Sequence, residues 1–194
     1  DDLISEMIRA EDDGDRLSTD ELRMLAAGLL MAGTDTTRNQ VAAAVDVFCD
    51  HPEQWELLAQ RPELAMKVVE EVMRFCPVVF GAMRMTTEDV ELAGVMIPAG
   101  TFVTCNTAAA NQDPDVYVEP DRFDIMREDA PPMQTFGAGA HYCLGANLAR
   151  LELNVIFEEL VARLRRPRLL APPRRLRSNF INGVKEMRIA FDPA

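Results

Sequence analysis

One ten-residue stretch decides the fold: Phe136-Gly137-Ala138-Gly139-Ala140-His141-Tyr142-Cys143-Leu144-Gly145. Its three glycines and two alanines permit a close approach of the backbone to something flat. Cys143 stands just ahead of the last predicted helix, and the partial positive charge at a helix N-terminus stabilises a thiolate that acts as a ligand or a nucleophile. For a cysteine considered alone, a small buried residue beside a glycine-rich turn is the alternative. A phosphate-binding loop does not fit, because the Walker Lys-Ser/Thr ending and the dinucleotide glycine spacing are absent.

The whole segment resembles the haem-binding signature of the cytochrome P-450 (haem-thiolate monooxygenase) family, Phe-x-x-Gly-x-x-x-Cys-x-Gly. Every fixed position of that signature is present, as Phe136, Gly139, Cys143 and Gly145. The resemblance implies that Cys143 is the axial ligand of haem b (iron protoporphyrin IX) and that Phe136 packs near its sulfur. It also implies that His141 approaches a haem propionate. Arg84 matches a family arginine that pairs with a propionate, and a solvated strand arginine is the alternative.

A second motif lies about 70 residues before this loop. Glu71-Val72-Met73-Arg74 has the E-x-x-R form, which places both charges on one helix face. Alone, such a pair is a surface ion pair. By its order and spacing it resembles the structural pair of the family, with Arg122 in Pro-Asp-Arg-Phe as the third member. The resemblance implies that these three residues pin the irregular stretch 111–135 against the core and take no part in catalysis.

A third motif, Ala32-Gly33-Thr34-Asp35-Thr36-Thr37, is poor helix material inside a predicted long helix. A crossing of helices at small residues is the alternative for the motif alone. It resembles the oxygen-binding stretch of the family's central helix. The resemblance implies that Ala32 and Gly33 lie over the haem face and that Asp35 and Thr36 support proton delivery. The Thr36 hydroxyl is then expected to interrupt the helical hydrogen-bond ladder.

The rest of the pattern predicts a mainly α-helical protein with small peripheral β elements. Ser18 and Glu21 have the spacing of a capping box, and apolar residues at helical spacing extend from there to Asp50. Further helices are predicted over residues 52–60, 62–75 and 144–163, extended segments over 78–84 and 101–106, a hairpin over 90–97, and strand and loop over 176–191. Residues 1–194 together resemble a single partial domain, the C-terminal haem-binding half of the cytochrome P-450 fold in its soluble bacterial form.

Composition limits the partners and the location. The net charge of −12 argues against nucleic acid, because phosphate binding requires clustered positive charge. No run approaches 18 apolar residues, so no membrane span is predicted. The sequence has no C-x-x-C pair, which predicts a reducing, cytoplasmic location. Its four cysteines are Cys49, Cys76, Cys105 and Cys143.

Charge is unevenly distributed along the chain. Residues 1–60 carry fourteen acidic side chains against four arginines, whereas residues 161–177 carry seven arginines and no acid. A solvated arginine-rich surface is one interpretation of the second segment. The other is a docking face for an acidic electron donor, a ferredoxin or flavodoxin.

The resemblance implies a reaction as well as a fold. It implies a monooxygenase that hydroxylates an apolar small molecule with dioxygen and two electrons from a redox partner of the ferredoxin or flavodoxin type. Substrate contacts are expected from Met31 and from residues 78–82 and 180–182, which are largely apolar. Asp35 and Thr36 argue against a peroxygenase or an isomerase, because chemistry that bypasses dioxygen does not require routed protons.

The sequence departs from the family chiefly in length, because only the second half of a complete member is represented. No Trp-x-x-x-Arg that would clamp the other haem edge occurs, since Trp55 lies in a different helix, and Gln112 stands where an arginine is common. The helix over residues 18–50 is therefore expected to leave apolar faces uncovered, which favours an oligomer. The alternative function is that of a truncated, catalytically silent relative or fragment that acts only through protein–protein contacts.

Overall fold

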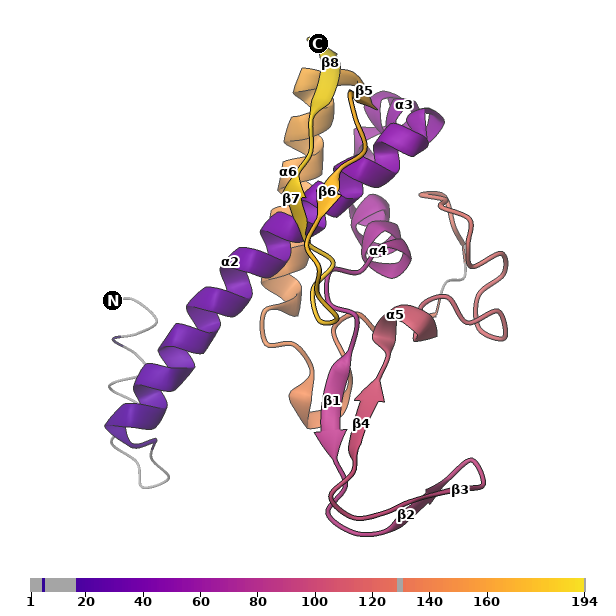
Figure 1. Ribbon diagram of the computed structural model, residues 1–194. Coiled ribbons are helices and arrows are strands. Elements are labelled where there is room, and N and C mark those ends of the chain that lie inside the picture. The colour runs from indigo at the N-terminus through magenta and orange to yellow at the C-terminus, as the bar shows by residue number, and fades with distance from the viewer. Residues whose placement is uncertain (1–4, 6–16, 129–130, 194) are drawn as a thin grey trace.

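The computed structural model describes residue 5, residues 17–128 and residues 131–193, and that part of the chain is mainly helical (Figure 1). The helices are α2 (Thr19–Asp50), α3 (Pro52–Gln60), α4 (Ala65–Phe75), α5 (Thr107–Ala110) and α6 (Ala146–Arg163), with 3-10 turns at Pro62–Leu64 and Gly139–His141. The strands are β1 (Ala82–Met85), β2 (Val90–Leu92), β3 (Val95–Ile97), β4 (Phe102–Cys105), β5 (Leu164–Leu169), β6 (Arg174–Arg175), β7 (Val184–Glu186) and β8 (Ile189–Pro193). The predicted fold class is confirmed.

Helix α2 begins at the predicted capping box. The Ser18 main-chain N–H donates to the Glu21 carboxylate at 2.7 Å, and the Glu21 N–H donates to the Ser18 hydroxyl at 3.3 Å. The helix then runs without a break to Asp50, and Pro52 opens α3. No helix within the described ranges is both long and apolar enough to cross a membrane.

Two predicted helices differ from the observed ones at their first turn. The segment predicted as one helix over residues 62–75 is a 3-10 turn followed by α4. The backbone of Leu64 departs from α-helical values, with ψ at −4°, so the α-helix proper starts one residue later. The last helix begins at Ala146 rather than at Leu144, because the Cys143 turn occupies the intervening residues.

The core lies where the C-terminal half of α2 meets α3, α4 and α6. At its centre the Phe48 ring makes edge-on contacts with Trp55, Phe123 and Phe157, at centroid distances of 5.1, 5.4 and 6.3 Å. Trp55 also donates its indole N–H to the Leu164 carbonyl at 3.1 Å, so the polar atom of this buried side chain is satisfied. The core therefore joins helices that are far apart in the sequence.

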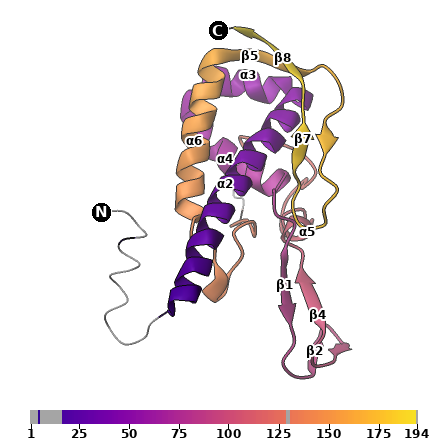
Figure 2. The ribbon, with the colours of Figure 1, turned by 60° about the vertical axis from the view of Figure 1, so that its left-hand side comes forward.

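Two helices carry apolar side chains on faces that no described residue covers. Helix α6 buries Leu153, Phe157 and Val161 in the core. The apolar residues that predicted this helix are exposed, with Leu144 in the turn before α6 and the other three on its surface: Leu148, Leu151 and Val155. The N-terminal half of α2 projects beyond the other helices (Figures 1 and 2) and exposes Met24, Leu25, Leu30 and Met31. We call these eight residues the uncovered apolar face.

The strands form four two-stranded antiparallel sheets at the periphery. The predicted hairpin is β2–β3, and Ala93 and Gly94 turn it with φ of 50° and 78°. In both views it extends from the far end of β1 and β4, away from the helices (Figures 1 and 2). Strand β5 was not predicted, because its sequence is rich in arginine and contains Pro167. It pairs with β8, and a register shift occurs between Arg165 and Arg168.

The two segments predicted to contact substrate lie side by side. The Phe80 N–H donates to the Phe180 carbonyl at 3.1 Å, and the Asn182 N–H donates to the Val78 carbonyl at 2.7 Å. The first segment is fastened to α2 by the buried Gln40 side chain, which accepts from the Val78 N–H at 3.1 Å. The Gln40 amide nitrogen also donates to the carbonyl of Cys76, the residue that directly follows α4, at 3.0 Å.

We predict that Gln40→Ala lowers the free energy of unfolding by about 1–3 kcal/mol, because it leaves the buried Val78 N–H without a partner. Urea unfolding followed by circular dichroism measures the change. Gln60→Ala is the matched control, since the Gln60 side chain makes only a long, exposed contact with Glu56 on the surface of α3. Equal stability losses in the two variants would contradict the prediction.

Candidate functional site

Cys143 is presented by a loop that closes on itself immediately before α6. The Cys143 N–H donates to the Phe136 carbonyl at 2.9 Å, and the Tyr142 N–H donates to the Gly139 carbonyl at 3.0 Å. Gly137 and Gly139 have φ of 73° and 69°, a region that other residues rarely adopt, so glycine is required at both positions. The loop therefore has one fixed shape and leaves the Cys143 side chain exposed at the start of a long helix.

The four cysteines are free thiols in different surroundings. Burial raises the pKa of Cys49 to about 11 and that of Cys76 to about 12, so both stay protonated near neutral pH. Cys105 and Cys143 are exposed. Cys105 lies within strand β4, whereas Cys143 directly precedes a helix, so Cys143 is the better placed of the two for ligation.

Arg150, which lies on α6, holds the Cys143 loop in place. Its guanidinium donates to the Glu70 carboxylate on α4 at 2.6 Å and to the Tyr142 hydroxyl at 3.3 Å. It also lies 4.5 Å from the centre of the Phe136 ring, a cation–π contact. The hydrogen bond with Glu70 raises the pKa of Arg150. The sequence motifs did not identify Arg150; the one signal for it is a cationic residue seven positions after Cys143, at a position that helical spacing places near the loop.

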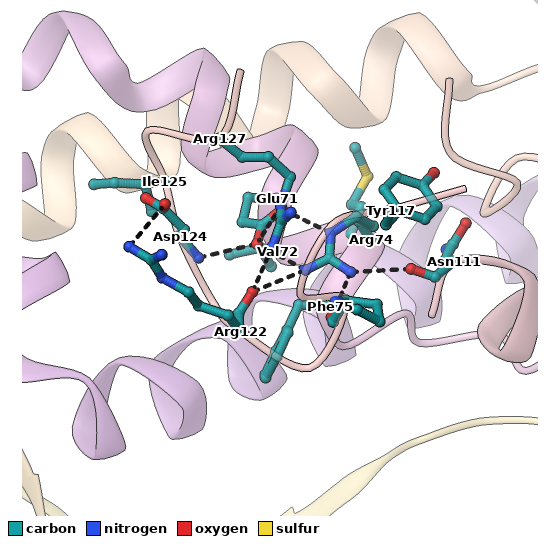
Figure 3. A network of polar contacts seen from close by, with 12 residues as sticks. Glu71, Val72, Arg74, Phe75, Asn111, Tyr117, Arg122, Asp124, Ile125 and Arg127 are labelled. Atoms are coloured by element: carbon teal, nitrogen blue, oxygen red, sulfur yellow. Dashed lines mark hydrogen bonds and ion pairs between the residues drawn. The ribbon is translucent and has the colours of Figure 1, made fainter. Parts of the chain in front are cut away.

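The E-x-x-R pair is the centre of a buried polar network (Figure 3). Arg74 and Glu71 join through two hydrogen bonds of 2.8 Å, and their side chains are only 2% and 4% exposed. The remaining N–H groups of Arg74 donate to three main-chain carbonyls at 2.8–3.1 Å, those of Asn111, Pro120 and Arg122. The pair is thus a buried structural element rather than a surface ion pair.

The third member of this network is Arg127, which corrects the prediction of Arg122. The Arg127 guanidinium lies 3.3 Å from the Glu71 carboxylate and is 12% exposed. The Arg122 side chain is 59% exposed and pairs with Glu119 and Asp124 at 3.2 and 3.3 Å. The chain turns at Glu119, where φ is 47°, so Arg122 faces α4 with its carbonyl and points its side chain outward.

The small-residue stretch of α2 lies on an open surface opposite α6. Ala32 and Gly33 are exposed, and no atom lies within 4 Å of a Cβ built on Gly33. The Asp35 carboxylate pairs with Arg38 at 2.7 Å. The Thr36 hydroxyl donates to the Ala32 carbonyl at 2.5 Å, within a stretch of α2 that is helical on both sides of it.

A groove of about 680 Å³ separates this stretch from α6. Its α2 side includes Gly33, Thr34 and Thr37, and its α6 side includes Leu151 and Val155. Helix packing thereby brings the α2 motif to the helix that follows Cys143, although the two motifs are far apart in the sequence.

The remaining predicted site residues lie at the surface. Arg84 is exposed on β1, where its guanidinium donates to the carbonyl of the preceding residue at 2.9 Å, and His141 is exposed in the 3-10 turn before Cys143. No atom lies within 4 Å of a Cβ built on Gly139 or Gly145, so open space borders the loop.

These residues fit a haem group. An exposed sulfur, apolar side chains beside it, and cationic side chains at the surface suit a flat apolar macrocycle that carries carboxylates. Within the described ranges, no cluster of three or more His, Cys, Asp or Glu side chains could hold a metal ion. The exposed sulfur of Cys143 could ligate an iron held within such a group, and His141 is a second exposed side chain of the same loop that could do so.

An exposed cysteine on a glycine-containing loop ahead of a long helix, together with a buried E-x-x-R network, is the arrangement expected of the haem-thiolate class. A model of the family "Cytochrome P450" matches residues 45–175. The chain belongs to the cytochrome P450 family.

Among curated relatives, the chain is 41% identical over its full length to a steroid C26-monooxygenase of Rhodococcus jostii (strain RHA1), of which it covers 41%. Over 82% of its length it is 48% identical to a vitamin D(3) 25-hydroxylase of Pseudonocardia autotrophica, of which it covers 40%. A solved cytochrome P450 from Chondromyces apiculatus matches all of the chain with a TM-score of 0.93 and 37% identity, and the match covers 50% of that protein. The chain thus spans half the length of these relatives or less.

We predict that Arg127→Ala lowers the free energy of unfolding by about 1–3 kcal/mol, because it removes one of the two guanidinium groups that compensate the buried Glu71 carboxylate. Arg122→Ala keeps the main-chain carbonyl that Arg74 uses and is expected to change stability by less than about 0.5 kcal/mol. Guanidinium chloride unfolding of both variants measures this. A larger loss in the Arg122 variant would restore the original assignment.

We also predict an order of thiol reactivity. Iodoacetamide at about pH 8 is expected to label Cys105 and Cys143 first and Cys76 last, because alkylation needs an accessible thiolate and burial raises the pKa of Cys76 to about 12. Peptide mass spectrometry over time measures the order. The same reaction in denaturant is the control, where all four thiols are expected to react at similar rates. Early labelling of Cys76 in the folded protein would contradict the assignment.

Proposed function

We propose that this protein is a haem-thiolate monooxygenase that hydroxylates an apolar small molecule with dioxygen and two electrons from a redox partner. The observation that carries the proposal is the exposed Cys143 side chain on a loop locked by the Phe136 carbonyl and braced by Arg150. Residues 1–194 would form one partial domain, the C-terminal haem-binding half of the family's fold.

Residues from three parts of the chain would hold the cofactor. Cys143 would bind the iron of haem b as a thiolate, with Phe136, Gly139 and Gly145 shaping the loop. Arg84 and His141 would pair with the propionates, and Ala32 and Gly33 would line the opposite face. A thiolate-bound haem supplies the activation of dioxygen, because the anionic sulfur pushes electron density that favours O–O cleavage.

Two side chains of α2 would handle protons. The Thr36 hydroxyl holds its proton against the Ala32 carbonyl, which leaves the Oγ1 lone pairs free to accept a hydrogen bond. Rotation of this hydroxyl away from the carbonyl would turn it into a donor. Asp35 pairs with Arg38 at a partly exposed position, so its carboxylate could exchange protons with solvent and pass them inward.

The substrate is proposed to be apolar. Met31 and Phe180 are 69% and 57% exposed, and the segment 78–82 lies beside 180–182 through main-chain hydrogen bonds. Two relatives are named for apolar substrates, the steroid C26-monooxygenase and the vitamin D(3) 25-hydroxylase, which supports the same class here. Apolar side chains would orient such a substrate by shape and exclude water from it.

The electron donor is proposed to be a ferredoxin or a flavodoxin. The arginine-rich segment offers less free charge for docking than its sequence suggests, because most of its arginines pair with acidic side chains of this chain. The paired residues are Arg163 with Glu159, Arg166 and Arg168 with Asp192, Arg174 with Glu186, and Arg175 with Asp46. A solvated arginine-rich surface therefore fits this segment better than a docking face.

A second function is favoured by one observation, the uncovered apolar face of α2 and α6. Apolar patches of this kind mark contacts with another polypeptide. A catalytically silent relative that acts through protein–protein contacts, or that oligomerises, would use that face. Such a catalytically silent protein would have no physical need for the free Cys143 sulfur on a locked loop.

The decisive measurement is the absorption spectrum of the purified protein supplied with haem, reduced and exposed to carbon monoxide. We predict a strongly red-shifted Soret band, the mark of thiolate ligation, that disappears in Cys143→Ala. Cys105→Ala is the matched control, because it removes the other exposed thiol and should keep the band. Absence of haem uptake, or a band typical of histidine ligation, would contradict the proposal and favour the second function.

A further inference from the structure

We propose that Asn111 is a positioning residue for the thiolate. It sets the position of the Cys143 loop by holding Gln134 and Thr135, the two residues that precede Phe136. This inference rests on the proposed function, because it assigns Asn111 a role in the geometry of the ligating sulfur. Asn111 is completely buried and lies just after α5, 32 positions before Cys143 in the sequence.

Both ends of the Asn111 amide bond the chain that leads into the loop. Its Oδ1 accepts from the Gln134 N–H at 2.7 Å, and its Nδ2 donates to the Thr135 hydroxyl at 2.8 Å. The Thr135 hydroxyl in turn donates to the Met73 carbonyl at 2.8 Å. Because a hydroxyl has one proton, these bonds run in one direction, from Asn111 through Thr135 to α4. The arrangement needs an acceptor and a donor on one short side chain, which suits asparagine.

Asn111 is itself held at both main-chain atoms. Its N–H donates to the Thr107 carbonyl at 3.0 Å, and its carbonyl accepts from the Arg74 guanidinium at 3.0 Å. Figure 3 shows this carbonyl facing Arg74, beside the Glu71–Arg74 pair. The buried ion pair therefore fixes Asn111, and the Asn111 side chain fixes residues 134–135.

The position of Thr135 affects the Cys143 sulfur through one intervening residue, Phe136. Thr135 directly precedes Phe136, and the Phe136 carbonyl accepts the Cys143 N–H at 2.9 Å. A shift of Thr135 moves that carbonyl and with it the backbone that carries the Cys143 side chain. Since thiolate ligation depends on sulfur placement and on nearby N–H groups, loss of the Asn111 contacts would weaken the thiolate state even in folded protein.

The test compares Asn111→Ala and Thr135→Val with two matched controls. Thr135→Ser keeps the hydroxyl and should rescue the Thr135 variant. Gln134→Ala keeps the main-chain N–H that Asn111 uses and removes only a side chain whose amide reaches the Pro132 carbonyl at 3.3 Å. The haem-loaded, reduced, carbon monoxide-bound spectrum gives the thiolate fraction. Amide hydrogen exchange in haem-free protein gives the protection of Gln134 and Cys143.

We expect Asn111→Ala and Thr135→Val to bind haem but to lose most of the red-shifted band, and to speed exchange at Gln134 or Cys143 by about five- to tenfold. Both controls should match the unmodified protein. An unchanged band in Thr135→Val and Asn111→Ala, or uniformly faster exchange across the core, would reduce Asn111 to a general stability role and overturn the proposal. If the unmodified protein shows no thiolate band, the proposed function fails first, and this inference fails with it.

Discussion

The fold around the site depends on one buried ion pair, Glu71 with Arg74. Moving both charges out of water costs several kcal/mol per ion, and that cost is offset only when each polar atom finds a partner in a fixed geometry. Arg74 meets this condition by donating to the Glu71 carboxylate and to three carbonyls of the irregular stretch 111–135. Because those carbonyls must lie where the guanidinium reaches them, residues 111–122 follow one defined path although they contain little regular structure. Arg127 adds a second cation and closes the network from the other end of that stretch.

The cysteine loop inherits its position from this network. On one side Asn111 links the Arg74 guanidinium to residues 134–135, and on the other side Arg150 links the Phe136 ring to Glu70 on α4. Glu70 and Glu71 are neighbours on the same helix, so α4 supplies the anchor for both sides of the loop. The exposed sulfur of Cys143 thus sits on a rigid support, although no helix or strand contains it.

The sequence predicted what local rules determine. The capping box at Ser18 and the proline at position 52 set the ends of α2, and the glycines around Cys143 marked a tight turn, because these effects act over a few residues. It failed where the direction of a side chain depends on the path of an irregular segment. Arg122 and Arg127 are both plausible partners for Glu71 by spacing, and only the turn at Glu119 decides between them. Asn111 gave no signal of its own, because it opens a stretch without periodicity and its partners Thr135 and Arg74 are brought to it only by folding.

The apolar periodicity of α6 shows a further limit, because a period identifies a helix without saying which face is buried. Two apolar faces exist here, and the core takes the one with Leu153 and Phe157. The other face includes the exposed Leu148, and Leu144, directly after Cys143 in the turn before the helix, adds a further exposed apolar side chain. Solvent would tolerate lysine or glutamate at such positions at little cost, whereas exposed leucine beside an exposed thiol is accounted for by something apolar that covers both. A flat apolar cofactor on the sulfur and a polypeptide along α6 are the two bodies of that kind. The two differ in what they require of Cys143. A cofactor bound through the sulfur needs the Cys143 thiolate, whereas a polypeptide packed along α6 does not.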